Sequence, residues 1–187
     1  IPRPETEELV ELILSENPES SLSVLDIGTG SGAIALALAN SRPDWKITAS
    51  DLSNDALALA AENAQFCNLS LTFVQSDCFE AISGSFDIIV SNPPYISEAD
   101  KDEVGLNVLT SEPHMALFAE EDGYAVYRKI AGQAEDYLTE KGKIYLEIGY
   151  KQGDGVAELL KQSFPHKRIR ILKDQFGKDR MVAVNNG

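Results

Sequence analysis

The sequence has few of the residues that bind metals or form disulfide frameworks. Two cysteines and two histidines occur among 187 residues, and none of them lies at a spacing typical of metal ligands. We therefore expect no metal site and no disulfide-stabilised secreted fold. No apolar run reaches the roughly 18–20 residues that a membrane-spanning helix needs. We expect a cytoplasmic protein that makes no contact with a membrane.

Positive charge is also scarce. Lysine and arginine total 16 against 30 aspartates and glutamates, so the formal net charge is −14. A surface of this sign repels phosphate backbones and attracts basic partners, although acidity that serves only solubility would give the same composition. We expect no stable complex with nucleic acid.

The chain begins without a methionine and without the basic and apolar segments of a signal peptide. Pro2 and Pro4 indicate a turn-like start, and we expect the natural N-terminus to lie upstream. There are no internal repeats, linkers or low-complexity tracts, and 187 residues suffice for one domain with a sizeable core. We therefore assign residues 1–187 to a single domain.

Short apolar runs alternate with helix-like segments, which predicts β-α-β units and a mostly parallel α/β sheet with helices on both faces. The predicted strands are 23–27, 45–50, 71–74, 86–91, 143–148, 168–172 and 181–184. The predicted helices are 33–40, 54–66, 124–138 and 156–163. The short connection between the last two strands favours an antiparallel hairpin, whereas a plain dinucleotide-binding sheet is more often wholly parallel. Residues 96–119 show no periodicity, and we expect a functional loop or lid there.

A glycine-rich segment follows the first predicted strand: Asp26-Ile27-Gly28-Thr29-Gly30-Ser31-Gly32-Ala33. Glycines let the backbone turn sharply from strand to helix and approach a ligand without a clash at Cβ. The segment predicts a site for a nucleoside-containing cofactor but does not say which one. A tight turn without a ligand is the alternative.

Aspartates end the next two predicted strands at the same edge of the sheet. Asp51 can accept hydrogen bonds from both hydroxyls of a ribose, or it can cap the following helix. Asp77 can accept from an adenine amino group, with Phe79 beside the ring, or it too can serve as a cap. Together with Asp26, these residues would bring three carboxylates to one crevice beyond the carboxyl ends of the strands.

The segment Asn92-Pro93-Pro94-Tyr95 follows the fourth predicted strand. The prolines restrict the backbone and lack an N–H, so nearby carbonyls point outward with little competition. Asn92 adds a side-chain carbonyl, and Tyr95 adds a flat face. Two acceptors and an aromatic wall suit a planar –NH2 group, whose delocalised lone pair makes it a poor nucleophile. Holding both hydrogens would direct that lone pair at a methyl donor, so catalysis would come from positioning. A turn that merely ends a strand is the alternative.

These residues resemble the amino-methyltransferases that carry an Asn-Pro-Pro-Tyr signature, a group with DNA adenine, RNA and protein glutamine enzymes. Within it, the chain resembles the HemK/PrmC family over nearly its whole length. The matching segments are residues 1–7 (Ile-Pro-Arg-Pro-Glu-Thr-Glu), 26–32, 91–96, 112–113, 117, 122–123, 146–149 and 152. The Pro-Arg-Pro-Glu-Thr-Glu stretch is the most specific of them, because DNA methylases do not carry it.

The resemblance implies a Rossmann-like class I methyltransferase fold, a seven-stranded mostly parallel sheet with an antiparallel final hairpin. It implies S-adenosyl-L-methionine as methyl donor, S-adenosyl-L-homocysteine as product, and methylation of N5 of the glutamine in the Gly-Gly-Gln motif of peptide chain release factors. By resemblance, residues 28–32 line the cofactor, Asp51 binds its ribose, and residues 92–95 hold the substrate glutamine, with Asn92 also bordering the cofactor.

Two departures from the family accompany this resemblance. The family usually has an aromatic residue where Cys78 stands, so we expect adenine packing to be weaker or to pass to Phe79. Its members also carry a helical N-terminal domain that helps to dock the release factor, and we expect that domain to be missing here. Because the release-factor tip approaches ribosomal RNA, we expect it to be basic and attracted to an acidic enzyme.

Three other functions stay open on the sequence. An RNA or DNA N6-adenine methyltransferase would use the same pocket on a flipped base, but the net charge disfavours it, and only Lys167, Arg168 and Arg170 form a basic cluster. A non-catalytic module that binds the methyl donor would not need Asn92 and Tyr95. An NAD-dependent reductase would share the glycine loop, and thermal stabilisation by NAD instead of S-adenosylhomocysteine would identify it.

Overall fold

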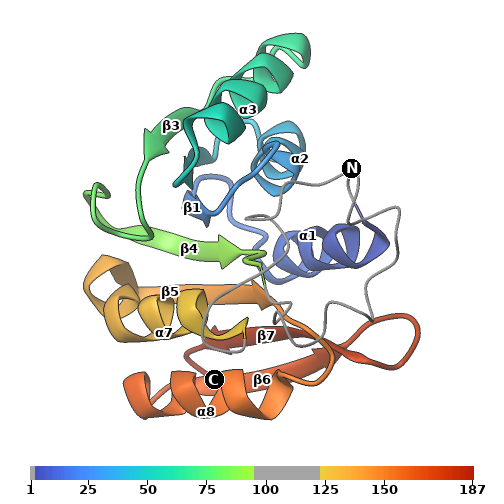
Figure 1. Cartoon of the computed structure of the whole chain (residues 1–187), viewed down its shortest axis with the longest axis vertical. Coiled ribbons are helices and arrows are strands. Elements are labelled where there is room, and N and C mark those ends of the chain that lie inside the picture. The colour runs from blue at the N-terminus through green and yellow to red at the C-terminus, as the bar shows by residue number, and fades with distance from the viewer. Residues whose placement is uncertain (1–2, 95–122) are drawn as a thin grey trace.

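The computed structural model describes residues 3–94 and 123–187 (Figure 1). Its strands are β1 (Ser23–Ile27), β2 (Lys46–Asp51), β3 (Thr72–Gln75), β4 (Phe86–Ser91), β5 (Leu138–Glu147), β6 (Arg168–Lys173) and β7 (Asp179–Asn185). They form one seven-stranded sheet in the order β3-β2-β1-β4-β5-β7-β6. Strands β1 to β5 pair in parallel, and β7 is antiparallel to both β5 and β6. The predicted fold class is confirmed, including the antiparallel final hairpin.

Helices cover both faces of the sheet. They are α1 (Pro4–Glu16), α2 (Ala33–Ser41), α3 (Asn54–Phe66), α7 (Ala125–Gln133), the 3-10 helix η2 (Ala134–Tyr137) and α8 (Gly153–Ser163). Helices α1 and α2 share one hydrophobic cluster with one face of the strands, and α7 and α8 share another with the opposite face. None of the helices in the described ranges is long and apolar enough to cross a membrane.

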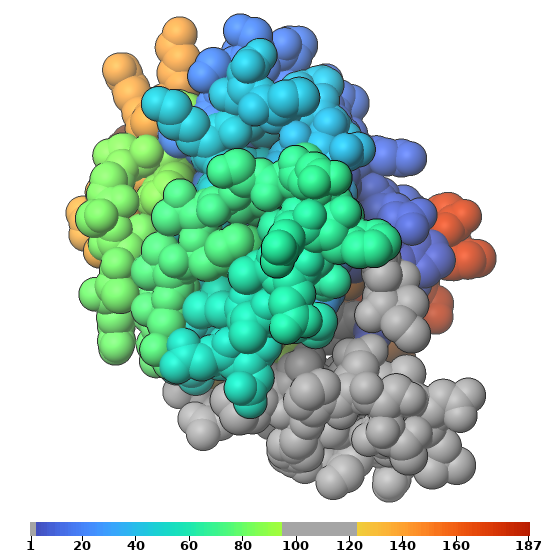
Figure 2. All heavy atoms as spheres, turned by 90° about the horizontal axis from the view of Figure 1, so that it is seen from above, coloured from blue at the N-terminus to red at the C-terminus, as the bar shows by residue number. Residues whose placement is uncertain are grey.

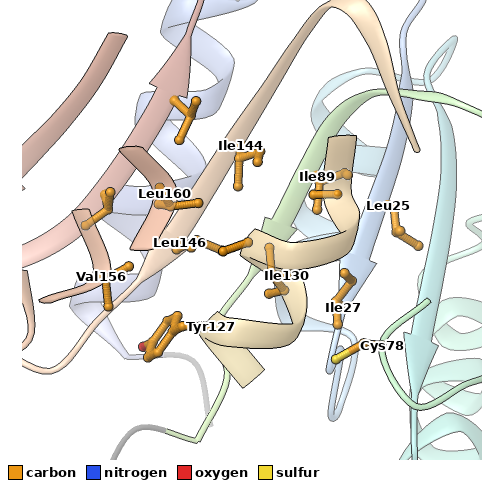
Figure 3. Packing of buried hydrophobic residues seen from close by; sticks show 14 of the residues in the cluster. Leu25, Ile27, Cys78, Ile89, Tyr127, Ile130, Ile144, Leu146, Val156 and Leu160 are labelled. Atoms are coloured by element: carbon orange, nitrogen blue, oxygen red, sulfur yellow. The ribbon is translucent and has the colours of Figure 1, made fainter. Parts of the chain in front are cut away.

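Alternation along the strands assigns each side chain to one face or the other. In β1, Leu25 and Ile27 face α7 and α8, whereas Val24 faces α1 and α2. Figure 3 shows Ile130 of α7 and Leu160 of α8 packing on the first of these faces. At the far end of the sheet, α3 packs beside β2 and β3, and Figure 2 looks onto that end.

The start of the chain differs from the sequence prediction. Instead of a turn, Pro4 begins α1, because a proline in the first helical turn gives up no hydrogen bond. The acidic Glu5 and Glu7 in that turn favour a helix N-terminus. Leu9 and Ile13 lie one turn apart, and both are completely buried, so α1 is an integral part of the core.

Three further boundaries differ from the prediction. The strand predicted to begin at residue 143 begins at Leu138, and the helix predicted to reach residue 138 ends at Gln133 and continues as η2. The pairing of β5 with β4 is irregular in this stretch, so the alternation that marks a strand is interrupted. Helix α8 begins at Gly153, three residues before its predicted start. The other predicted elements agree within two residues, and the predicted loop 96–119 lies outside the described residues.

The C-terminal end of α1 is fixed to the sheet by a network of charged and polar groups. Glu16 accepts hydrogen bonds from Nη1 and Nη2 of Arg170 at 2.7 and 2.8 Å, and from the Tyr145 hydroxyl at 2.9 Å. The side chains of Arg170 and Glu16 are only 22% and 24% exposed. Asn17 donates to the Tyr145 oxygen at 3.0 Å. These contacts hold α1 against β5 and β6.

We expect Glu16→Gln to lower the free energy of unfolding by about 1–2 kcal/mol at pH 7, because the charge-assisted pair with Arg170 is lost. Hydrogen bonding to Arg170 holds the pKa of Glu16 below its usual value of 4.5. The stabilisation is therefore present above pH 4.5 and disappears as the pH falls through the lowered pKa. Urea unfolding at pH 7 and pH 3 measures this, with Glu62→Gln on the exposed side of α3 as the control. An equal effect at both pH values would contradict the assignment.

Candidate functional site

Four parallel strands end level with one another at one edge of the sheet. Ile27 of β1 pairs with Ser50 of β2 and with Ser91 of β4, and Ser91 pairs with Leu146 of β5. The Ser91 hydroxyl also donates to the Ile27 carbonyl at 2.6 Å. The next residues along these strands are consequently neighbours at the edge: Gly28, Asp51, Asn92 and Glu147.

The glycine-rich segment forms the turn between β1 and α2, as predicted. Gly30 has a φ of 56°, and a Cβ there would meet no atom of the described residues within 4 Å, so these residues leave open space in front of this backbone. Gly32 has a φ of 84°, and its Cβ would approach Ala60 of α3 to 3.2 Å. The Thr29 amide donates to the Ser50 carbonyl at 2.9 Å, and the Ser31 carbonyl accepts from the side chain of Asn63 at 2.9 Å. The turn is thus fixed to its neighbours on one side and open on the other.

Asp51 supports this turn and does not cap the following helix. One carboxylate oxygen accepts from the Gly30 amide at 2.9 Å, and the other accepts from the Ser53 amide at 2.9 Å. The cap of α3 is Ser53, whose hydroxyl accepts from the Ala56 amide at 3.3 Å. Asp51 is half-buried at the tip of β2, beside the open side of the glycine turn.

Asp26 does not share an open crevice with Asp51 and Asp77, contrary to the sequence prediction. Its side chain is 1% exposed and accepts from the Thr29 hydroxyl at 2.6 Å. Burial raises the pKa of Asp26 to about 7, which the Thr29 hydroxyl and the Ala35 amide oppose. Its Oδ1 is buried and makes no hydrogen bond of ordinary geometry with the described residues. Asp26 lies beneath the glycine turn and supports it from inside.

The segment after β3 also differs from the prediction. Asp77 forms an ion pair with Lys129 of α7 at 2.6 Å. Phe79 is 1% exposed and stacks on Tyr137 with ring centroids 4.6 Å apart, so its ring is a core residue with no face open to an adenine. Cys78 is buried as well, where it lies near Ile27 (Figure 3), and burial raises the pKa of its thiol to about 11.

Asn92 is half-buried at the end of β4 and belongs to a contact that the sequence did not reveal. Its Nδ2 donates to Oγ1 of Thr6 at 3.3 Å, and the Thr6 hydroxyl donates to Oε2 of Glu147 at 2.7 Å. The available signal was a charged residue in the apolar run of β5, where Glu147 is 1% exposed. Pro93 is buried and Pro94 half-buried. The predicted site residue Tyr95 lies outside the described residues.

The described part of the chain contains no group of three or more His, Cys, Asp or Glu side chains that could hold a metal ion. The side chains and backbone groups at this edge can instead accept and donate hydrogen bonds. The open glycine turn and the half-buried Asp51 suit the hydroxyls of a nucleoside, and the amide of Asn92 lies on the neighbouring strand. This edge can therefore place a nucleoside-containing ligand beside a second group that hydrogen-bonds to the Asn92 side chain.

We expect Asp26→Asn to change how stability depends on pH. Because the folded pKa of about 7 lies above the unfolded value of 3.8, the wild-type protein loses stability as pH rises from about 4 to 7. The asparagine cannot ionise, so its stability relative to wild type should grow across that window and then level off, by at most about 4 kcal/mol at roughly 1.4 kcal/mol per pH unit. Urea unfolding at pH 4, 5.5, 7 and 8 tests this against the exposed control Asp44→Asn. A difference that does not vary with pH would refute it.

Known proteins are similar to this chain in sequence or in fold. A family model described as "Methyltransferase small domain" matches residues 6–117. Over 187 residues, the chain is 68% identical to a release factor glutamine methyltransferase of Streptococcus pneumoniae, covering 100% of this chain and 67% of that one. It is 57% identical over 184 residues to the enzyme of that name from Lactococcus lactis, covering 98% and 68%. A methyltransferase structure from Pyrococcus furiosus is similar at a TM-score of 0.71 and 20% identity, covering 98% of this chain and 83% of that one. The chain therefore belongs to the family of release factor glutamine methyltransferases.

Proposed function

We propose that this chain transfers a methyl group from S-adenosyl-L-methionine to the side-chain nitrogen N5 of the glutamine in the Gly-Gly-Gln motif of a peptide chain release factor. One observation supports this most directly. In a chain that is 68% identical to a release factor glutamine methyltransferase, the glycine turn and Asn92 follow residues that pair directly, Ile27 and Ser91. A cofactor at the turn and a planar –NH2 group at Asn92 would therefore lie next to each other.

The groups around the glycine turn fit the methyl donor. A carboxylate has about four lone-pair sites, and Asp51 uses two of them on backbone amides, which leaves acceptors for two ribose hydroxyls. The space in front of Gly30 lets a ligand contact the backbone. Lone pairs of Asp77 beyond its contact with Lys129 would accept from the adenine amino group.

Bound S-adenosyl-L-methionine supplies an electrophilic methyl group on a sulfonium sulfur and leaves as S-adenosyl-L-homocysteine. The part of this chain is to orient the amide nitrogen, whose lone pair is delocalised. Oδ1 of Asn92 accepts no hydrogen bond from the described residues and would accept one N–H of the glutamine. A carbonyl of the Asn92–Pro94 segment would accept the other. With both hydrogens held, the lone pair would face the cofactor, so positioning and charge stabilisation would lower the barrier. The N–CH3 bond would form as the S–CH3 bond breaks, and the methylated nitrogen would then lose one proton to water.

The protein partner fits the charge of the chain. A net charge of −14 attracts a basic protein segment and repels a phosphate backbone. We propose that the release factor presents a basic Gly-Gly-Gln region, and that no stable nucleic-acid complex forms. The relatives named for glutamine methylation are 57% and 68% identical, which disfavours the alternative of N6-adenine methylation.

Methyl transfer from labelled S-adenosyl-L-methionine to a purified release factor tests the proposal. The matched control is the same factor with the Gly-Gly-Gln glutamine replaced, and bulk RNA and DNA are assayed in parallel. We expect label on the unaltered factor only. Label on nucleic acid but not on the factor would show that the proposed substrate is wrong. Equal label on both versions of the factor would show that the proposed site of methylation is wrong.

Two variants should separate acceptor binding from cofactor binding. We expect Asn92→Ala to lower kcat about 100-fold or more while the Kd for S-adenosyl-L-homocysteine stays within a few-fold. We expect Asp51→Ala to raise that Kd roughly 10- to 100-fold, because charge-assisted hydrogen bonds are worth about 1.5–3 kcal/mol. Calorimetric titration and steady-state kinetics measure the two effects. Parallel loss of affinity and activity in Asn92→Ala would show that its side chain serves mainly the cofactor.

A further inference from the structure

Two consecutive hydrogen bonds link Asn92 to a buried carboxyl group. Thr6 lies in the first turn of α1, Asn92 follows β4, and Glu147 ends β5, so positions 86 and 141 residues apart meet here. The donor–acceptor distances are 3.3 Å from Asn92 to Thr6 and 2.7 Å from Thr6 to Glu147. Thr6 is 7% exposed and Glu147 1% exposed, so water competes little for these bonds.

The direction of these bonds follows from the chemistry of the three groups. An ionised carboxylate can only accept, so the single hydroxyl proton of Thr6 is donated to Glu147. The Thr6 oxygen must then accept from Asn92, and only the –NH2 end of an amide can donate. The carbonyl end of Asn92 is consequently turned away from Thr6. It makes no hydrogen bond with the described residues.

The surroundings of Glu147 bear on its charge. Burial raises the pKa of Glu147, and the Thr6 hydroxyl, Arg180 and Arg3 all oppose that rise, whereas Glu5 adds to it. The Glu147 backbone is fixed too, since its carbonyl accepts from the Tyr127 hydroxyl at 2.8 Å. The Thr6 hydroxyl, Arg180 and Arg3 therefore offset part of the effect of burial, and the Glu147 oxygen accepts the hydrogen bond from Thr6.

We propose that Thr6 and Glu147 are positioning residues that hold the Asn92 side chain with its carbonyl turned toward the –NH2 group of the acceptor. This inference rests on the proposed methyl transfer to a planar nitrogen. We call the two hydrogen bonds from Asn92 through Thr6 to Glu147 the relay. Without the relay, the Asn92 amide can rotate and present its own –NH2 group to the –NH2 group of the substrate, so that two hydrogen-bond donors face each other. The acceptor nitrogen is then held less well, and misplacement of a reacting group is costly in rate.

Kinetics of Thr6→Val test the relay, because valine keeps the shape of threonine and removes the hydroxyl. We expect kcat for methyl transfer to fall about 10-fold or more, with the Kd for S-adenosyl-L-homocysteine within about 3-fold of wild type. Thr6→Ser restores the hydroxyl and should recover most of kcat. The control is Thr72→Val, the same chemical change on the exposed edge strand β3. Equal losses of kcat in Thr6→Ser and Thr6→Val would overturn the proposal.

A second measurement needs no substrate and separates failure of the relay from failure of the proposed function. The side-chain 15N–H2 signals of Asn92, assigned by their loss in Asn92→Asp, report on its hydrogen bond in the protein alone. We expect Thr6→Val to shift these signals and speed their exchange with water several-fold, while Thr6→Ser leaves them close to wild type. Unchanged signals in a folded Thr6→Val protein would overturn the relay, whatever the acceptor. Altered signals in an enzyme that methylates another acceptor would keep the relay and overturn only the substrate.

Discussion

The site depends on one constraint: the parallel strands β1, β2, β4 and β5 end in register at the same edge of the sheet. Because β1 is paired on both sides, with Ile27 opposite Ser50 and Ser91, a slip of one residue would exchange the side chains that face α1 and α2 with those that face α7 and α8. Both faces are covered by helices, so neither side tolerates such a slip. Burial of the core thereby fixes the relative positions of Gly28, Asp51 and Asn92.

Much of this arrangement could be predicted from the sequence because its signals are local. Apolar runs that stop at Gly28, Asp51 and Asn92 mark strand ends, and parallel pairing brings such ends to one edge. Which polar residue follows each strand can likewise be read directly from the sequence. What a sequence does not show is which way the side chains at a strand end point. Asp26 pairs with Ala49 and Val90 inside the sheet, two residues before Gly28 at the exposed edge, and this is why it is buried.

The same limit explains the segment after β3. Cys78 has a φ of 49°, an uncommon conformation for a residue with a side chain, and the chain turns there. The turn directs Phe79 into the core, where Tyr137 provides a stacking partner. Nothing in the local sequence distinguishes this outcome from one in which the ring faces outward, because the partner comes from an element 58 residues further along the chain.

The contact among Thr6, Asn92 and Glu147 is the least local feature of the site. It exists only when α1 is docked, and docking depends on apolar burial of Leu9 and Ile13 and on the ion pair of Glu16 with Arg170. Both ends of α1 thus have a role, the C-terminal end as an anchor to β6 and the first turn as a support for Asn92. Docking of α1 and the orientation of the Asn92 side chain are therefore coupled through one element.

The relay does not distinguish a glutamine amide from an adenine amino group, because a carbonyl acceptor suits any planar –NH2 group. Discrimination must come from groups outside the relay. The basic cluster of Lys167, Arg168 and Arg170 does not border the site, because it lies toward the start of β6, at the opposite edge of the sheet from Glu147. In the basic cluster of β6 and the residue before it, Arg170 binds Glu16. Lys167 donates to the Gly142 carbonyl at 3.0 Å and to the Asn186 side chain. Nucleic-acid affinity depends on cations that replace the counterions of phosphates. This chain has 30 acidic residues, and two of the three cations of its basic cluster are hydrogen-bonded within the protein. Both features favour a protein as the methyl acceptor over a nucleic acid.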